Sequence, residues 1–267
     1  MAETFTMKLA GLSVRVECRD PWVREFCDAY VCPDPVSEPD FCVGTTEEQV
    51  RAQCAEAQTL GGSIETAYAE SLCLYREIAE KLPYYDRFVF HGACIALDGK
   101  GYLFTAPSGT GKSTHILLWR QYFGNRVRIV NGDKPILHLL PDGSAEVCST
   151  PWAGKERWQR NRTVPLAGLC VLERGTFNRT EPLDVLSHPE LLVRQTYLPQ
   201  DARAAGRTLE LLGRLGAAGG VRFCRLWCDM SEEAVRVSWE GLTGKKLTQD
   251  AVSGQETNGE KESGDED

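Results

Sequence analysis

The chain has 267 residues, of which 42% are hydrophobic and 25% are charged, and its formal net charge is −8. This length and composition are typical of one sizeable globular domain, or of one domain with a small N-terminal addition. The sequence has no run of about 18 apolar residues and no basic, apolar start of a secretory signal. We therefore expect a cytoplasmic protein with no membrane partner.

The first part of the chain predicts one strand, one loop and one helix. Residues 7–16 alternate apolar and polar side chains, which is typical of a half-exposed strand, and the proline-rich residues 31–40 indicate a loop. Residues 63–82 repeat apolar side chains at helical spacing and stop at Pro83, which predicts a helix. We expect residues 1–60 to form a strand and loop region packed on a core of residues 61–243.

A β-hairpin is predicted next. The apolar residues 88–97 and 102–104 flank Asp98-Gly99-Lys100-Gly101, and a tight reversal needs the positive φ angles that glycine supplies. One arm of this hairpin leads directly into a glycine-rich turn. A helix over residues 115–122 and a buried strand over residues 126–130 are expected after that turn.

The remaining elements alternate between strands and helices, so the fold class we expect is α/β with a mixed sheet. Strands are predicted at residues 136–140, 145–148 and 166–172, and helices at residues 189–197, 202–215 and 232–242. Residues 244–267 contain seven acids and three lysines and almost no apolar side chains, which predicts a disordered acidic tail. The rest of the chain is close to charge balance, so no nucleic-acid partner is expected.

Eleven cysteines do not indicate a disulfide framework, because their number is odd and the chain is long. The pairs Cys27/Cys32 and Cys224/Cys228 lack the spacing that a structural zinc site needs. We expect reduced thiols, most of which act as small hydrophobic side chains.

The glycine-rich turn has the pattern of a phosphate-binding loop. Its sequence, residues 105–115, is TAPSGTGKSTH, in which Ala106 stands where such a loop usually begins with glycine. In these loops backbone N–H groups surround phosphate oxygens, a lysine adds positive charge, and the next hydroxyl binds Mg²⁺. A chance glycine turn before a helix is the simpler alternative. The nucleotide-binding residues that we expect are Ser108, Gly109, Thr110, Gly111, Lys112, Ser113 and Thr114.

A carboxylate for the metal follows the next strand. The apolar strand RVRIV runs into Asn131-Gly132-Asp133-Lys134. Asp133 suits the second metal anchor that nucleotide-binding loops use, together with Ser113. The alternative is an ordinary turn aspartate, because turns favour Asn and Asp.

These segments resemble a known family. HGACIALDGKGYLFTAPSGTGKSTHILLW and RVRIVNGDKPILHL are similar to the catalytic domain of HPr serine kinase/phosphorylase, whose P-loop fold is shared with phosphoenolpyruvate carboxykinase. The resemblance implies such a fold here, with a β-hairpin leading into the P-loop. It also implies ATP, or another nucleoside triphosphate, and Mg²⁺ as cofactors. Gly132 departs from the family, which has an aspartate at this position.

The resemblance also assigns roles. It implies that Lys112 contacts phosphates, that Asp133 holds metal and takes the acceptor's proton, and that His91 orients or tunes Asp133. Without the resemblance, a core histidine is the simpler interpretation of His91. Lys155 lies in a basic loop that we expect Trp152 and Trp158 to anchor, and it is our candidate for contacting the transferred phosphate. The alternative for this loop is a merely solvated basic segment.

The function we expect is an ATP- and Mg²⁺-dependent kinase that phosphorylates a hydroxyl of a protein, a peptide or a small molecule. The rival from another class is a nucleotide-dependent binding module, in which ATP hydrolysis switches partner binding without phosphotransfer. Labelled ATP separates the two, because label reaches a hydroxyl only in a kinase.

Overall fold

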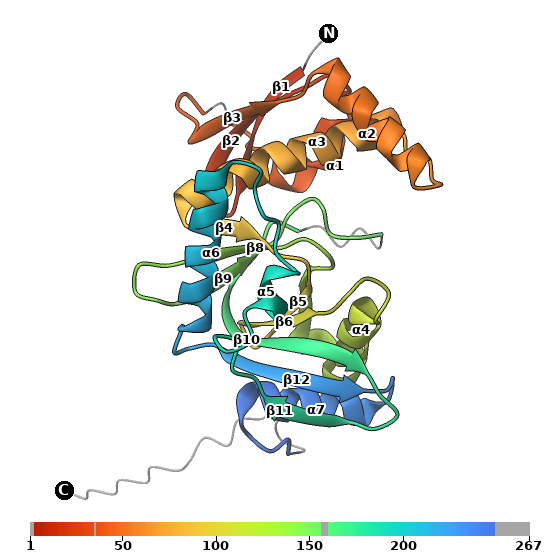
Figure 1. Cartoon of the computed structure of the whole chain (residues 1–267), viewed down its shortest axis with the longest axis vertical. Helices are drawn as coiled ribbons and strands as arrows, with labels where there is room; N and C mark the ends of the chain where they lie inside the picture. The colour runs from red at the N-terminus through yellow and green to blue at the C-terminus, as the bar shows by residue number, and fades with distance from the viewer. Residues whose placement is uncertain (1–2, 35, 156–159, 249–267) are drawn as a thin grey trace, which may run out of the picture.

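The structure, a computed structural model, describes residues 3–34, 36–155 and 160–248. It is a mixed α/β fold in which a small N-terminal sheet and three helices lie above a larger curled sheet (Figure 1). The helices are α1 (Trp22–Phe26), α2 (Glu47–Thr59), α3 (Thr66–Lys81), α4 (Lys112–Phe123), α5 (Glu190–Val193), α6 (Ala202–Gly216) and α7 (Glu232–Thr243). Within the described ranges, none of these helices is long and apolar enough to cross a bilayer.

Two sheets organise the chain. The small sheet has the order β1 (Glu3–Leu9), β2 (Leu12–Cys18) and β3 (Phe41–Gly44). The large sheet has the order β4 (Arg87–Val89), β8 (Ile136–Leu139), β9 (Ala145–Cys148), β10 (Thr163–Arg174), β6 (Lys100–Thr105), β5 (Ala93–Leu97) and β7 (Val127–Asn131). β12 (Arg222–Cys228) also pairs with β10, and β11 (Arg179–Pro182) pairs with β12.

Strand β10 decides where the carboxyl ends of the strands meet. It runs parallel to both β6 and β12 and antiparallel to β9. Because parallel strands end at the same edge of a sheet, the loop that follows β6 lies beside the last residues of β10 and β12. This edge carries the glycine-rich loop.

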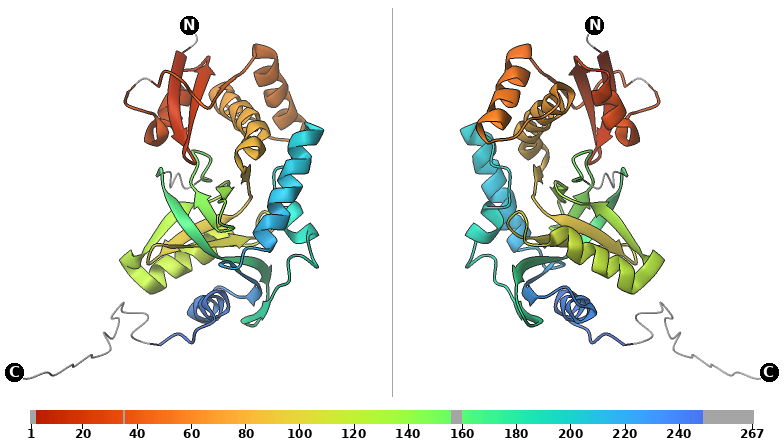
Figure 2. Two further views of the ribbon diagram at one scale, coloured as in Figure 1. Left: turned by 90° about the vertical axis from the view of Figure 1, so that its left-hand side faces the viewer. Right: turned by 90° about the vertical axis from the view of Figure 1, so that its right-hand side faces the viewer.

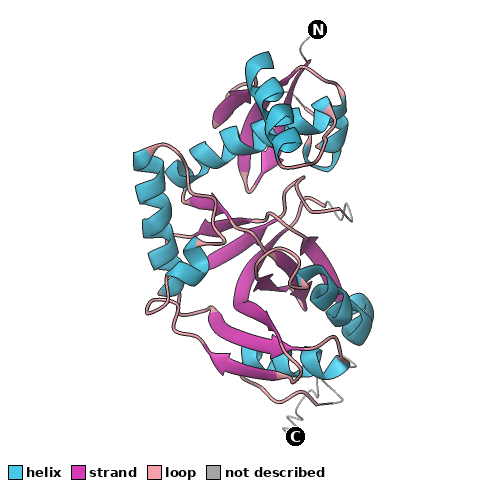
Figure 3. Cartoon of the chain, turned by 45° about the vertical axis from the view of Figure 1, so that its right-hand side comes forward, coloured by secondary structure: helices cyan, strands magenta, loops and turns pink. Residues whose placement is uncertain are grey.

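The large sheet is covered on both faces, which explains why every residue of β5 is buried. Ile95 packs in one hydrophobic cluster with Trp119 of α4 and Trp239 of α7. Its neighbour Cys94 packs in the other cluster, with Leu211 of α6. The two views in Figure 2 and the colouring of Figure 3 show these helices on either side of the strands.

The N-terminal region differs from the single strand predicted at residues 7–16. Ala10 and Gly11 adopt φ angles of 50° and 82°, and this two-residue turn folds the segment into the hairpin β1–β2. The region also contains α1 and α2, which the sequence analysis did not predict. Helix α2 begins with a capping box between Thr46 and Gln49. The helix predicted at residues 63–82 is confirmed as α3.

The N-terminal sheet and the large sheet share a hydrophobic cluster. Val14 and Val16 of β2 pack in it with Ile136 of β8 and with Trp152. The buried Tyr30 also donates from its hydroxyl to Ser149 Oγ at 3.0 Å. The division of the chain at residue 60 stays a prediction, and residues 249–267 of the predicted acidic tail lie outside the described residues.

The hairpin before the loop is confirmed. Strands β5 and β6 pair antiparallel around Asp98 and Gly99, whose φ angles are 50° and 77°. The apolar segment 88–97 is not one strand, however. It breaks at residues 90–92, because β4 pairs with β8 whereas β5 pairs with β6 and β7.

The later elements are partly as predicted. The strands at residues 126–130, 136–140, 145–148 and 166–172 are observed as β7 to β10, and the helix at residues 115–122 starts earlier, as α4. Helices α6 and α7 confirm the last two predicted helices. The helix predicted at residues 189–197 is wrong beyond Val193, because Thr196 forms a bridge with Phe90 instead. Strands β11 and β12 were not predicted.

Candidate active site

The glycine-rich loop joins the end of β6 to the start of α4 at Lys112. Gly109 and Gly111 adopt φ angles of 77° and 119°, which other residues reach only with strain. Among the described non-glycine residues, positive φ occurs at Ala10, Asp86 and Asp98 only, so Ala106 does not need glycine's freedom. Alanine at the opening position is therefore compatible with this loop.

The space above the loop is open. A Cβ atom built on Gly109 or Gly111 would meet no described atom within 4 Å. Backbone N–H groups there can be approached closely by an anion, and the amino end of the 12-residue helix α4 favours negative charge at the same place. The loop residues thus fit a phosphate group. Ser108 and Thr114 are exposed, and Ser113 is half-buried.

Lys112 is folded back onto this loop. Its side chain is 8% exposed, and Nζ donates to the carbonyl oxygens of Ala106 at 2.9 Å and Pro107 at 3.4 Å. Burial lowers the pKa of Lys112, whereas the nearby charge of Asp133 raises it. Lys112 and Asp133 therefore lie within electrostatic reach of each other, although they come from different strand–loop units.

The turn after β7 holds Asp133 in place. Asn131 is fully buried, and its Oδ1 accepts the backbone N–H groups of both Asp133 and Lys134 at 2.9 Å. Its Nδ2 donates to the Thr150 carbonyl at 3.1 Å, and the Thr150 hydroxyl donates to the Lys134 carbonyl at 2.7 Å. The asparagine side chain thus ties the turn to the strand end and to the segment after β9.

The Asp133 carboxylate has two basic neighbours. His91 Nε2 lies 3.4 Å from Oδ1, and Lys134 Nζ lies 2.7 Å from Oδ2. Burial raises the pKa of Asp133, but the hydrogen bond from His91 and the charge of Lys134 outweigh burial and lower it to about 2. Asp133 is therefore fully ionised near neutral pH.

His91 is held on three sides. Its Nδ1 lies 2.9 Å from Gln195 Oε1, and its backbone N–H donates to the Gln195 carbonyl at 2.6 Å. Its own carbonyl accepts from the Thr105 hydroxyl, at the last residue before the loop. The next N–H, of Gly92, donates to the Asp133 carbonyl at 2.9 Å. His91 thus links the strand that enters the loop to the turn that carries Asp133.

Lys155 lies near the same turn. Together with Asp133 and Lys134 it lines a cavity of about 490 Å³, and its own side chain is exposed. Trp152, predicted to anchor this basic loop, is buried at 5% exposure. Trp158, the second predicted anchor, lies outside the described residues.

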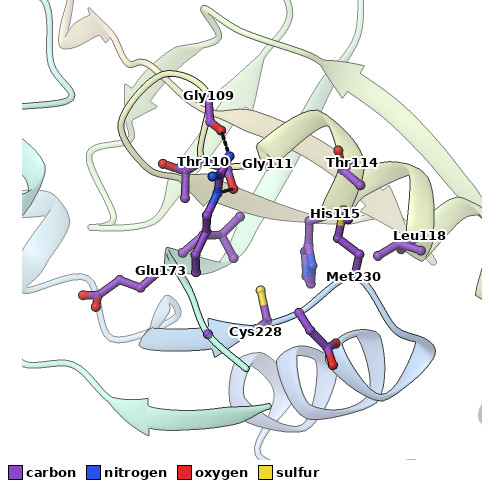
Figure 4. A pocket seen from close by; sticks show the side chains of 13 residues that line it. Gly109, Thr110, Gly111, Thr114, His115, Leu118, Glu173, Cys228 and Met230 are labelled. Carbon is purple, nitrogen blue, oxygen red and sulfur yellow. Dashed lines mark hydrogen bonds between the residues drawn. The ribbon is translucent and has the colours of Figure 1, made fainter. Parts of the chain in front are cut away.

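A second cavity, of about 500 Å³, is lined by the glycine-rich loop. Figure 4 shows Gly109 and Thr110 on one side of it and Cys228 and Met230, at and after the end of β12, on the other. Its wall on α4 includes His115, whose pKa burial lowers to about 3. This histidine is therefore uncharged near neutral pH.

Some site residues were missed by the sequence analysis. Arg174, the last residue of β10, donates from its guanidinium to the carbonyl oxygens of Gly109 and Thr110. Gln195 lies in the segment that was predicted to be helical. Neither residue stands in a recognisable motif, and Gln195 is revealed only by its contact with His91. A basic residue directly before Gly175 at a strand end was the available signal.

The chain offers few protein ligands for a metal. No group of three or more His, Cys, Asp or Glu side chains in the described part of the chain could hold a metal ion. The assignment of Mg²⁺ to Ser113 and Asp133 stays a prediction; this hard cation keeps several waters and takes its other ligands from nucleotide phosphates. Such a site needs only one or two protein oxygens.

No protein-family model matches the chain, and no curated protein matches it. A solved structure, the Hpr(Ser) kinase/phosphatase from Coxiella burnetii, is similar at 14% identity over 49% of this chain and 93% of that one, with a TM-score of 0.26. The likeness is weak, and we draw no functional argument from it.

Proposed function

We propose that this protein is an ATP- and Mg²⁺-dependent kinase that transfers a phosphoryl group to a hydroxyl, with a P-loop fold like that of HPr kinase. The observation that carries the proposal is the ionised Asp133 within electrostatic reach of Lys112 at the start of α4. The hairpin that leads into the loop and the His91–Asp133 pair support it further.

In this proposal ATP supplies the phosphoryl group, and Mg²⁺ neutralises charge on the phosphates. Loop N–H groups from Ser108 to Thr114 bind the phosphates, and Lys112 turns from its carbonyl partners to the phosphate oxygens. Ser113 and Asp133 hold the metal. Lys155 is the candidate for the charge that builds on the transferred group. These steps are positioning and electrostatics, which dominate phosphoryl transfer.

Asp133 also faces the acceptor in this mechanism. It accepts a hydrogen bond from the acceptor hydroxyl and takes its proton as the new P–O bond forms and the bond to the leaving phosphate breaks. A carboxylate with a pKa of about 2 is a weak base. That is sufficient because the loose transition state of phosphoryl transfer requires little proton removal before bonding. His91 and Lys134 keep Asp133 ionised and oriented.

In the proposed kinase, residues 61–243 are the kinase core, residues 1–60 are a region packed on it, and the acidic tail is an appendage. The partner is a hydroxyl-bearing molecule in the cytoplasm.

The test is transfer from γ-labelled ATP. Purified protein is incubated with Mg²⁺, labelled ATP and candidate hydroxyl acceptors, and label is traced to a phosphoester or to free phosphate. Lys112→Ala and Asp133→Asn should each abolish transfer, whereas Glu210→Gln, on the exposed side of α6, should not. Label that appears only as free phosphate, together with ATP-dependent capture of a partner, would favour the switch module. Full transfer by Asp133→Asn would remove the proposed base.

A further inference from the structure

The cavity beside Asp133 has an aromatic wall that comes from the N-terminal part of the chain. Trp22 and Phe26 of α1 and Tyr68 and Leu72 of α3 line it, opposite Asp133 and Trp152. We call this space of about 490 Å³ the aromatic cavity. Figure 2 shows α1 and α3 stacked above the large sheet, where they can form such a wall.

The rings of this wall form an ordered set. Trp22 and Phe26 are stacked with centroids 5.0 Å apart, and Tyr68 meets both of them edge-on at 6.4 and 6.5 Å. The ring centroid of Phe26 also lies 6.1 Å from that of Trp152, so these two rings are in contact beside the cavity. Flat apolar surfaces of this kind bind another ring or a flat apolar group, because they bury its area and stack on its face.

The cavity lining also contains charged side chains. They are Lys155 and the ion pair of Lys134 with Asp133, whose Nζ and Oδ2 atoms lie 2.7 Å apart. Trp152 is 5% exposed, and among the described residues its indole N–H has no hydrogen-bond partner. This nitrogen is buried, so it does not add to the polar lining that a bound molecule would meet.

The size of the cavity matches a small molecule. Ligand sites for small molecules enclose roughly 300–1,000 Å³, whereas a protein partner needs a broad contact surface of about 800 Å². Of the large apolar side chains that are exposed in the described chain, only Tyr68, at 40%, lines this cavity. The described residues around the aromatic cavity therefore form an enclosed site for a small molecule rather than a broad protein-binding surface.

We propose that the aromatic cavity binds the phosphate acceptor, and that this acceptor is a small alcohol with an aromatic or flat apolar body and a carboxylate. The body lies on Trp22, Phe26 and Tyr68, and the hydroxyl faces Asp133. The carboxylate faces Lys155, which then serves the acceptor rather than the transferred phosphoryl group. The role as acceptor rests on the proposed kinase function. Binding to the aromatic cavity does not depend on that function. An experiment can therefore refute the binding site or the kinase function without refuting the other.

The first experiment measures binding without nucleotide. The probe is 3-phenyllactate, which has a ring, a carboxylate and one hydroxyl, and lactate is the same molecule without the ring. We expect 3-phenyllactate to bind about tenfold more tightly than lactate by calorimetry, since ring burial adds affinity. Equal affinities, or no binding of 3-phenyllactate, would overturn the inference.

Two exposed tyrosines provide matched variants. Tyr68→Ala removes a cavity ring that is 40% exposed, and Tyr84→Ala removes a ring that is 42% exposed and outside the cavity lining. We expect Tyr68→Ala to weaken 3-phenyllactate binding about tenfold and Tyr84→Ala to leave it unchanged. Binding that is unaffected by Tyr68→Ala would place the probe elsewhere and refute the site.

The second experiment adds labelled ATP and Mg²⁺. If 3-phenyllactate binds with the expected dependence on Tyr68 but label never reaches a hydroxyl, the kinase proposal fails and the binding site stands. If label reaches only proteins, and 3-phenyllactate neither binds nor competes, the kinase proposal stands and the small-molecule acceptor is wrong. Label in 3-phenyllactate that depends on Tyr68 supports both.

Discussion

Replacing the Asp133 carboxylate by an amide, in Asp133→Asn, isolates the electrostatics of the candidate site because the side chain keeps its size. The carboxylate is ionised and lies between His91 Nε2 and Lys134 Nζ. Removing its charge should leave both neighbours without their anion. The folded state should therefore lose stability in a manner that depends on pH.

The size of that loss follows from the pKa of Asp133. It falls from 3.8, the value of an exposed aspartate, to about 2 in the folded protein. At about 1.4 kcal/mol for each pKa unit, the ionised form adds at most about 2.5 kcal/mol to the free energy of unfolding. The side chain is 31% exposed, so solvent screening reduces this toward about 1 kcal/mol. A domain with about 5–15 kcal/mol of stability stays folded after such a loss.

The sign of the pH dependence is fixed by the lowered pKa. The contribution is fully present above the unfolded value of 3.8, and it is lost as pH falls toward about 2. Urea unfolding of the wild type and Asp133→Asn between pH 7 and pH 3 should show a difference that is constant at high pH and shrinks below about pH 4. Glu210→Gln serves as the control. The assigned electrostatics would be refuted if the wild type and Asp133→Asn were equally stable at pH 7. They would also be refuted if the difference between their free energies of unfolding did not change with pH.

Four further predictions concern the loop lysine and three glycines. Lys112→Ala should weaken binding of a fluorescent ATP analogue about 10- to 100-fold, because a charge-assisted contact is lost, and unchanged affinity would contradict the loop assignment. Gly111→Ala places a side chain at φ 119°, so it should lower stability by about 1–2 kcal/mol in thermal melts, and an unchanged melting temperature would contradict the strained geometry. Gly101→Ala puts a Cβ 2.9 Å from Val164 Cγ2 and should destabilise by about 1–3 kcal/mol. In Gly206→Ala, within α6, the new Cβ meets no described atom within 4 Å, and a gain of about 0.5–1 kcal/mol is expected in urea unfolding.

Local patterns predicted the elements around the loop well. The Asp98-Gly99 turn, the glycine-rich loop and the strand before Asn131 each depend on a few adjacent residues, and the structure has the hairpin, the loop and the strand there. The prediction of a single strand at residues 7–16 was wrong because the alternation of apolar and polar side chains continues across Ala10 and Gly11, where the chain reverses. Periodicity of side chains alone does not reveal a turn that preserves the alternation.

Long-range contacts of the candidate site could not be predicted from local sequence. Arg174 reaches the loop only because β10 and β6 run parallel, and Gln195 reaches His91 only because a predicted helix ends early. The aromatic wall is a similar case, since α1 is too short to show a periodic pattern and Tyr68 lies on a helix whose partners are distant. The proposed roles of Asp133, His91 and Lys155 stay predictions until transfer is measured.

The hydrophobic cluster shared by the two sheets limits how this protein can be dissected. A fragment starting at residue 61 would lack the strands that cover Val89, Ile136 and Trp152, and it would present these apolar side chains to water. Such a truncation is prone to aggregate, so inactivity of the fragment would say nothing about chemistry. In any chimera made with another protein, both regions have to be transplanted together.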